Sequence, residues 1–187
     1  MLSPSLQHHI NVQLIETAMI PDVTWNTVNT IQQPAAKDSA LSEAGFLPGT
    51  LLLTQDGELP VEYLSKGDRI ITRNAGLVRI AGIGHGKQRV RAIRFAAGSS
   101  GDTRPESDLT LPAGQQVLVR DWRAQAMFGR KQALVRADAL VDGMFVRDLG
   151  TRDLSLFQLY FDASHILYAG GFELAGHGAP AELRPAA

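Results

Sequence analysis

Asp162, Ser164 and His165 are the three residue types of a hydrolytic catalytic triad, and they stand within four positions of one another. In such a triad the serine attacks a carbonyl carbon, the histidine carries the proton and the carboxylate orients the imidazole. Side chains of a strand alternate between its two faces, so a strand here would separate His165 from Asp162 and Ser164. We therefore expect that these neighbours do not form one relay. Although their types are those of a triad, their spacing favours a structural role.

A second stretch, Gly82–Lys87, resembles a loop that cradles phosphate groups. The phosphate-binding loop needs one more residue before its Gly-Lys pair and a Ser or Thr after it, where this chain has Gln88. No helical pattern follows that would supply a helix N-terminus for an anion. We interpret the stretch as a glycine-kinked strand or a hairpin corner with an exposed His85.

The histidines and cysteines give no metal-binding pattern. The chain has five histidines, none at the i, i+4 spacing of a metalloprotease helix, and it has no cysteine. The missing cysteines exclude disulfides, thiolate-bound zinc, iron–sulfur clusters and a cysteine nucleophile. We expect neither a metal nor a cofactor. The histidines are His8, His9, His85, His165 and His177.

Charge and hydropathy exclude two classes of partner. The 187 residues carry a formal net charge of −1, so no basic excess favours nucleic acid. No apolar run approaches the ~20 residues of a membrane-spanning helix, and the N-terminus has no secretory signal, which predicts a cytoplasmic protein. Without a basic stripe, Trp25 and Trp122 are interpreted as packing anchors, and residues 120–130 as a solvated face.

The elements that must position these residues change in character along the chain. Residues 1–44 form an N-terminal segment with one alternating stretch, Ile10–Leu14, and a linker. Residues 45–178 contain short β-branched runs separated by turn residues, which predicts an all-β domain rather than βαβ units. Residues 179–187 are expected to be a flexible tail. The predicted strands are 51–54, 70–72, 78–83, 90–95, 117–119, 144–146, 156–161 and 166–168.

A short internal repeat lies within the β region, where Val61–Ile70 aligns with Ala137–Val146. Both copies contain an acidic residue, a leucine two positions later and a glycine three positions after that, ahead of a β-branched residue. We interpret each copy as a turn that buries the leucine, followed by a glycine with positive φ and a departing strand. Two copies predict two related halves about a pseudo-two-fold axis.

The first β motif resembles the opening of bacterial Hint (hedgehog/intein) domains. The resemblance covers about residues 45–178 and implies a flattened, all-β horseshoe with an internal duplication. The later matches are Asp108-Leu109 with Val117–Val119, Ala137–Gly143, and Asp162 with Ile166–Ala169. The opening match consists of Gly49–Thr54, Asp56-Gly57, Pro60–Leu64, Lys66–Asp68 and Ile70–Arg73.

The family's usual chemistry is protein self-processing, in which a first Cys or Ser attacks the preceding carbonyl and a histidine moves protons. In this chain the nucleophile position holds Gly45, and the Ser/Thr-x-x-His box becomes Pro112 to Gln115. In the late Asp-x-His-Glu element, Ser164 stands at the histidine position and His165 at the glutamate position, unless the register slips by one residue. The neighbouring Ser42 lies about 10 Å upstream along an extended chain, too far to substitute as nucleophile. Thr50 and Thr54 are interpreted as structural hydroxyls.

The resemblance thus implies a Hint-like domain without autoprocessing, acting as a binding or interaction module for a protein or a small polar ligand. A remnant pocket lined by Gln115, Asp162 and either Ser164 or His165 would bind such a ligand. A first alternative is a hydrolase or acyl-transfer enzyme that re-uses the old cleft through Asp162, Ser164 and His165. A second alternative is a structural or oligomerisation module that uses sheet edges.

Overall fold

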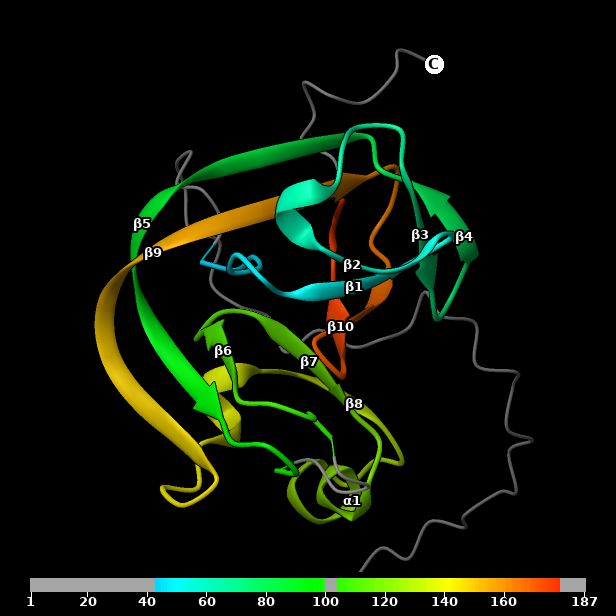
Figure 1. Ribbon diagram of the computed structural model, residues 1–187. Coiled ribbons are helices and arrows are strands. Elements are labelled where there is room, and N and C mark those ends of the chain that lie inside the picture. Colours follow the sequence, from blue (N-terminus) through cyan, green and yellow to red (C-terminus); the bar gives the residue numbers. More distant parts are fainter. Residues whose placement is uncertain (1–42, 100–103, 179–187) are drawn as a thin grey trace, which may run out of the picture. The chain divides into compact units, whose positions relative to one another are not determined.

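A computed structural model describes residues 43–99 and 104–178 of this chain (Figure 1). The predictions for strand Ile10–Leu14, Ser42, Trp25, the His8-His9 pair and the tail 179–187 fall outside the described residues. In the part that is described, strands predominate, and the only α-helix there is the seven-residue α1 (Trp122–Phe128). The all-β prediction is confirmed.

Eight strands form the larger sheet, in the order β2-β1-β3-β10-β11-β7-β8, with β4 paired to β3. All its pairings are antiparallel, and its middle joins strands from the two ends of the described chain, because β10 contacts both β1 and β3. The strands are β1 (Leu51–Thr54), β2 (Gly57–Pro60), β3 (Arg69–Thr72), β4 (Gly76–Arg79), β7 (Gln116–Val119), β8 (Ala133–Arg136), β10 (Ile166–Ala169) and β11 (Phe172–Ala175).

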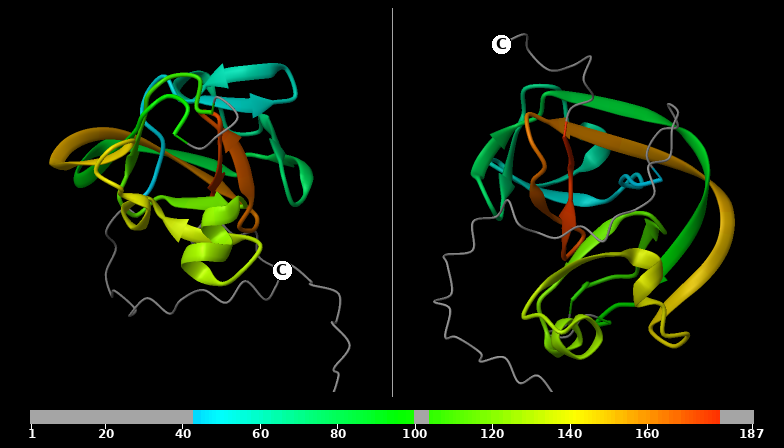
Figure 2. Two further views of the ribbon diagram at one scale, coloured as in Figure 1. Left: turned by 90° about the horizontal axis from the view of Figure 1, so that it is seen from below. Right: turned by 180° about the vertical axis from the view of Figure 1, so that it is seen from behind.

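Two long strands dominate the second sheet, whose order is β12-β9-β5-β6. β5 (Gly82–Phe95) and β9 (Val146–Phe161) pair along nearly their whole length, and the ribbon they form curves around the larger sheet (Figures 1 and 2). β6 (Leu109–Pro112) pairs with β5 and β12 (His177–Gly178) with β9. The ends of the ribbon bury Ile93, Phe95, Leu159 and Phe161 in the core.

The stretch Gly82–Lys87 lies within β5, so the interpretation as a glycine-containing strand is confirmed and no phosphate loop is formed. Gly84 packs closely against the paired strand, since a Cβ there would lie 3.3 Å from the ring of Tyr160. His85 is exposed, as predicted; its Nε2 lies 2.8 Å from Ser155 Oγ, and its ring stacks on Phe157.

Both copies of the internal repeat adopt the same local structure. Val61–Tyr63 and Ala137–Leu140 are single 3₁₀ turns that bury Leu64 and Leu140, and glycines at φ +100° and +77° follow at Gly67 and Gly143. Each turn begins beside a hairpin, β1–β2 or β7–β8, and these hairpins occupy opposite ends of the larger sheet. The order of the sheet therefore supports the predicted pseudo-two-fold duplication.

Several element boundaries differ from those predicted. Residues 78–83 are divided between β4 and β5, and the predicted strands 90–95 and 156–161 are parts of β5 and β9. Of the predicted strand 144–146 only Val146 lies in β9, because residues 144 and 145 belong to the bend before it. The central ribbon carries charges such as Lys87, Arg89 and Asp153 because it is exposed to solvent, so its sequence lacks a continuous apolar signal. The prediction that Trp122 is a packing anchor is wrong, since it begins α1 with 76% of its surface exposed.

Candidate functional site

The peptide between Ala44 and Gly45, where the family's chemistry would act, lies against the C-terminal part of β9, at residues 156–158. The next residue, Phe46, is fully buried and forms an isolated antiparallel bridge with Phe157. Its N–H and C=O each make a 2.8 Å hydrogen bond with the backbone of Phe157. This bridge fixes the chain as it enters the body and so fixes the peptide before it.

Gln115, which replaces the family's histidine, holds the nitrogen side of this peptide. Its Oε1 accepts a 3.1 Å hydrogen bond from the Gly45 N–H, and its Nε2 donates to the carbonyls of Ala175 (2.9 Å) and Gln116 (3.2 Å). The side chain is fully buried at the end of a turn that leads into β7. One acceptor and two donors are used, which matches the hydrogen-bonding capacity of a carboxamide with one lone pair to spare.

Gln158 holds the carbonyl side. It lies in β9 with 1% of its surface exposed, and its Nε2 donates a 3.2 Å hydrogen bond to the Ala44 carbonyl. The Tyr160 hydroxyl donates a 2.7 Å bond to Gln158 Oε1, which fixes the amide orientation. Burial raises the pKa of the Tyr160 phenol, so it remains a donor at neutral pH. The sequence analysis did not identify Gln158 as a candidate site residue. The available signal was an amide two positions after Leu156, on the same face of the predicted strand as this buried leucine.

Gly45 has no room for a side chain. Its φ is +155°, and a Cβ built there would lie 2.8 Å from the Phe157 carbonyl oxygen. A second close approach occurs at Gly114, within the altered box, where a Cβ would lie 2.7 Å from the Glu43 carbonyl oxygen. The two glycines let the backbone of residues 43–45 pass directly between β9 and the turn before β7. We call this arrangement, formed by Gln115 and Gln158 around the Ala44–Gly45 peptide, the amide clamp.

The amide clamp orients a peptide but has no group that exchanges protons. A leaving nitrogen needs a proton donor, yet the atom facing the Gly45 nitrogen is a carbonyl oxygen. Among the residues that the structure describes, the neutral N–H of Gln158 at 3.2 Å is the one donor to the Ala44 carbonyl oxygen, fewer than the several donors typical of an oxyanion hole. The geometry therefore suits holding an intact peptide bond.

The late element lies in a bend between β9 and β10, not on a strand. His165 Nε2 lies 2.9 Å from Asp162 Oδ1, so the expectation that these neighbours do not pair is wrong for Asp162 and His165. The bend turns both side chains to one side, while no hydrogen bond within the described residues joins Ser164 Oγ to either. His165 is buried and Ser164 is exposed.

The described structure brings Gly45 and Gln115 into contact but does not bring Asp162, Ser164 or His165 into the amide clamp through any side-chain hydrogen bond. Hydrogen bonds through the backbone link the two regions, since Gln115 Nε2 donates to the Ala175 carbonyl and the Gly176 N–H donates to the His165 carbonyl at 2.8 Å. Pro112 ends β6, where its missing N–H is compatible with the sheet edge.

We predict that Asp162→Asn weakens the dependence of stability on pH in acid. The hydrogen bond from His165, assisted by the Ala163 N–H and opposed by slight burial, holds the pKa of Asp162 below its usual 3.8. A depressed carboxyl pKa stabilises the folded state above the unfolded value, and that contribution disappears as pH falls below about 4. Urea denaturation between pH 5 and pH 2 should show a shallower loss in the variant than in wild type. Asp56→Asn, at an exposed turn, is the control; an unchanged acid slope in Asp162→Asn would contradict the prediction.

The remaining candidates have structural or surface roles. Thr54 Oγ1 donates to the Gly57 carbonyl at 2.7 Å and accepts from the Asp56 N–H, closing the β1–β2 turn. Thr50 is 4% exposed at the start of β1. Within residues 43–99 and 104–178, no three His, Asp or Glu side chains gather in a way that would hold a metal ion. The same residues contain no helix of the length and apolarity needed to cross a membrane.

The body is a duplicated all-β fold, and the chain enters it at Gly45, beside the Pro112–Gln115 turn. This arrangement is that of the Hint class of domain. The family model of the Hint domain matches residues 44–175, and the chain belongs to this family.

Solved structures similar to this chain include inteins and an intein-like domain, all at low identity. The bacterial intein-like domain from Clostridium thermocellum is 14% identical over 72% of this chain and 98% of its own, with a TM-score of 0.48. A DnaB intein from Synechocystis sp. is 12% identical over 73% and 99%, with a TM-score of 0.48. The gp41-1 intein is 11% identical over 72% and 98%, with a TM-score of 0.45. A search of curated proteins found no match.

Proposed function

We propose that this chain is a Hint domain that does not process itself and acts as a binding or interaction module. The observation that carries the proposal is the amide clamp, in which Gln115 and Gln158 form hydrogen bonds with the two sides of the Ala44–Gly45 peptide. Gly45 has no attacking group, and Gln115 has no titratable proton. Nucleophile and proton carrier act as a unit in covalent catalysis, so the loss of both removes this route.

Intact-mass spectrometry of the full chain tests the proposal. After prolonged incubation at neutral pH with dithiothreitol or hydroxylamine, which capture thioesters and esters, we expect one species of full mass. A pair of fragments corresponding to residues 1–44 and 45–187 would overturn the proposal. A variant in which Gly45 and Gln115 are replaced by Cys and His serves as a probe of the site. The Cβ that this variant adds at position 45 would lie 2.8 Å from the Phe157 carbonyl oxygen. We therefore expect no cleavage from this variant either.

The pairing of Asp162 with His165 favours a second candidate, a hydrolase or acyl-transfer enzyme that uses Ser164 as the nucleophile. This candidate predicts covalent labelling by a serine-directed fluorophosphonate and loss of the label in Ser164→Ala and in His165→Ala. The non-processing module predicts no label. Labelling that persists in Ser164→Ala would place the reactive hydroxyl elsewhere and exclude this hydrolase.

A further inference from the structure

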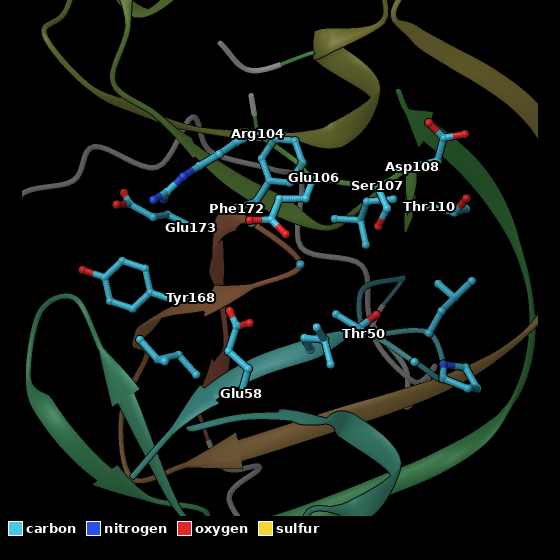
Figure 3. Close-up of a pocket in the computed structure, with 18 residues that line it drawn as sticks. Thr50, Glu58, Arg104, Glu106, Ser107, Asp108, Thr110, Tyr168, Phe172 and Glu173 are labelled. Carbon is cyan, nitrogen blue, oxygen red and sulfur yellow. The ribbon is translucent and has the colours of Figure 1, made fainter. Parts of the chain in front are cut away.

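A pocket with a volume of about 670 Å³ lies in the described part of the chain, and neither Gln115 nor Gln158 lines it (Figure 3). One wall comes from residues 47–51, Leu53 and Glu58 at the β1–β2 hairpin, and a second from Tyr168 and residues 170–173 around the β10–β11 turn. A third comes from Arg104 and residues 106–110 leading into β6. This volume is within the range of ligand-binding pockets. We call it the hairpin groove.

The apolar part of the hairpin groove is exposed where a ligand would contact it. Leu51 of β1 is 42% exposed, and Tyr168 and Phe172 lie on the adjacent β10–β11 unit. Phe172 packs edge to face against Phe95, which anchors this wall to the core. A ligand with an apolar portion would therefore bury Leu51 against a wall that is already rigid.

Two carboxylates face one another across the hairpin groove. Figure 3 shows the side chains of Glu58, from β2, and Glu106, from the segment before β6, pointing toward its centre from opposite walls. Both are exposed, and neither forms an ion pair with any of the described residues. The other two acids of the lining are already compensated: Arg94 pairs with Asp108, and Arg73 (3.0 Å) and Arg120 (2.6 Å) pair with Glu173. Arg104 also lines the groove, and Figure 3 shows its side chain extending toward Glu173. Two carboxylates and one guanidinium of the lining thus have no ion pair among the described residues, and the sum of these charges is negative.

β6 presents main-chain groups to the same space. The Ala113 N–H binds the Arg91 carbonyl at 2.8 Å, so by the alternation of an antiparallel pair Thr110 and Arg94 form a non-hydrogen-bonded pair. The N–H and C=O of Thr110 then point away from β5. β6 is the last strand of its sheet in the described chain, and Thr110 lines the hairpin groove. An extended peptide that lay beside β6 could therefore form main-chain hydrogen bonds with the N–H and C=O of Thr110.

We propose that the hairpin groove binds an extended peptide segment of a partner protein that carries a lysine or arginine. The main chain of the segment pairs with Thr110, its basic side chain lies between Glu58 and Glu106, and an apolar neighbour covers Leu51. Charge complementarity selects a basic side chain, and the free strand edge selects a peptide over a small amine. This inference names the partner class for the proposed interaction module, but it does not depend on the absence of self-cleavage.

Selection of a random pentapeptide library on the full-length chain, followed by fluorescence anisotropy of the enriched peptides, tests this inference. We expect enrichment of Lys or Arg at one position with β-branched neighbours, and weaker binding at high salt. Replacing Glu58 and Glu106 together by Gln should weaken binding by about tenfold. Asp153→Asn, an exposed change on β9, is the matched control and should leave the affinity unchanged. Circular dichroism verifies that each variant folds.

Several outcomes overturn the inference. The selected peptides could show no preference for Lys or Arg, or the Glu58 and Glu106 double variant could bind them with the affinity of the wild-type chain. Spermidine that bound as tightly as the peptides would also contradict the inference. The mass measurement remains separate: fragments with preserved peptide binding would refute only the non-processing proposal, and an intact chain without peptide binding would refute only the hairpin groove.

Discussion

Gly45→Ala is expected to lower the free energy of unfolding by about 2–5 kcal/mol. Its backbone, at φ +155°, is one that residues with a Cβ rarely adopt, and the added methyl would lie 2.8 Å from the Phe157 carbonyl oxygen. That carbonyl accepts the Phe46 N–H, so relief of the clash must disturb the bridge that anchors the chain entry. Urea denaturation followed by circular dichroism measures the difference in the free energy of unfolding between the wild-type chain and Gly45→Ala.

Gly49→Ala is the matched control for this prediction. Gly49 also has a positive φ, +81°, but no atom lies within 4 Å of its added Cβ. Its substitution should cost about 1–2 kcal/mol from backbone strain alone. Equal losses in the two variants would show that the close approach at Gly45 does not constrain the site.

Gln115→Met should be similarly severe, with a loss of about 2–5 kcal/mol. Methionine keeps the length of the side chain but removes the acceptor for the buried Gly45 N–H and the donor to the Ala175 carbonyl. Each buried polar group left without a partner costs about 1–3 kcal/mol. Thermal and urea unfolding measure the change.

Gln116→Met, the same change at the next residue, provides the comparison. Gln116 is half-buried in β7, and none of the described residues forms a hydrogen bond with its side-chain amide. We expect Gln116→Met to lower the free energy of unfolding by less than about 1 kcal/mol, as for most surface substitutions. A loss at Gln116 as large as that at Gln115 would mean that the hydrogen bonds of the amide clamp contribute little.

The family pattern predicted one half of the amide clamp and missed the other. Gly45 and Gln115 stand at positions that the opening motif identifies, and the structure brings them into contact. Gln158 lies in a run of aromatic and aliphatic residues, where a single amide has no motif around it. Its role depends on the pairing of Phe46 with Phe157 across more than a hundred residues, which no local pattern encodes.

The local structure was predictable where a turn dictates it and less so where tertiary contacts do. The repeated leucine–glycine spacing correctly indicated two turns, each with a buried leucine and a positive-φ glycine, because these are local requirements; the structure shows that both turns are 3₁₀. The long ribbon of β5 and β9 was divided in the prediction because its middle is solvated on both sides. The pairing of Asp162 with His165 was not predicted, because the face argument assumed strand geometry for residues that form a bend between the predicted strands 156–161 and 166–168.

Hydrogen exchange at the Gly45 amide tests most directly whether this domain holds a peptide where its relatives place a reactive group. If Gln115 accepts that N–H in a buried site, we predict exchange at least ~100-fold slower than in an unstructured chain, and faster exchange in Gln115→Met relative to the core amide of Leu174. Exchange of Gly45 at the unprotected rate in the wild-type chain would contradict the account.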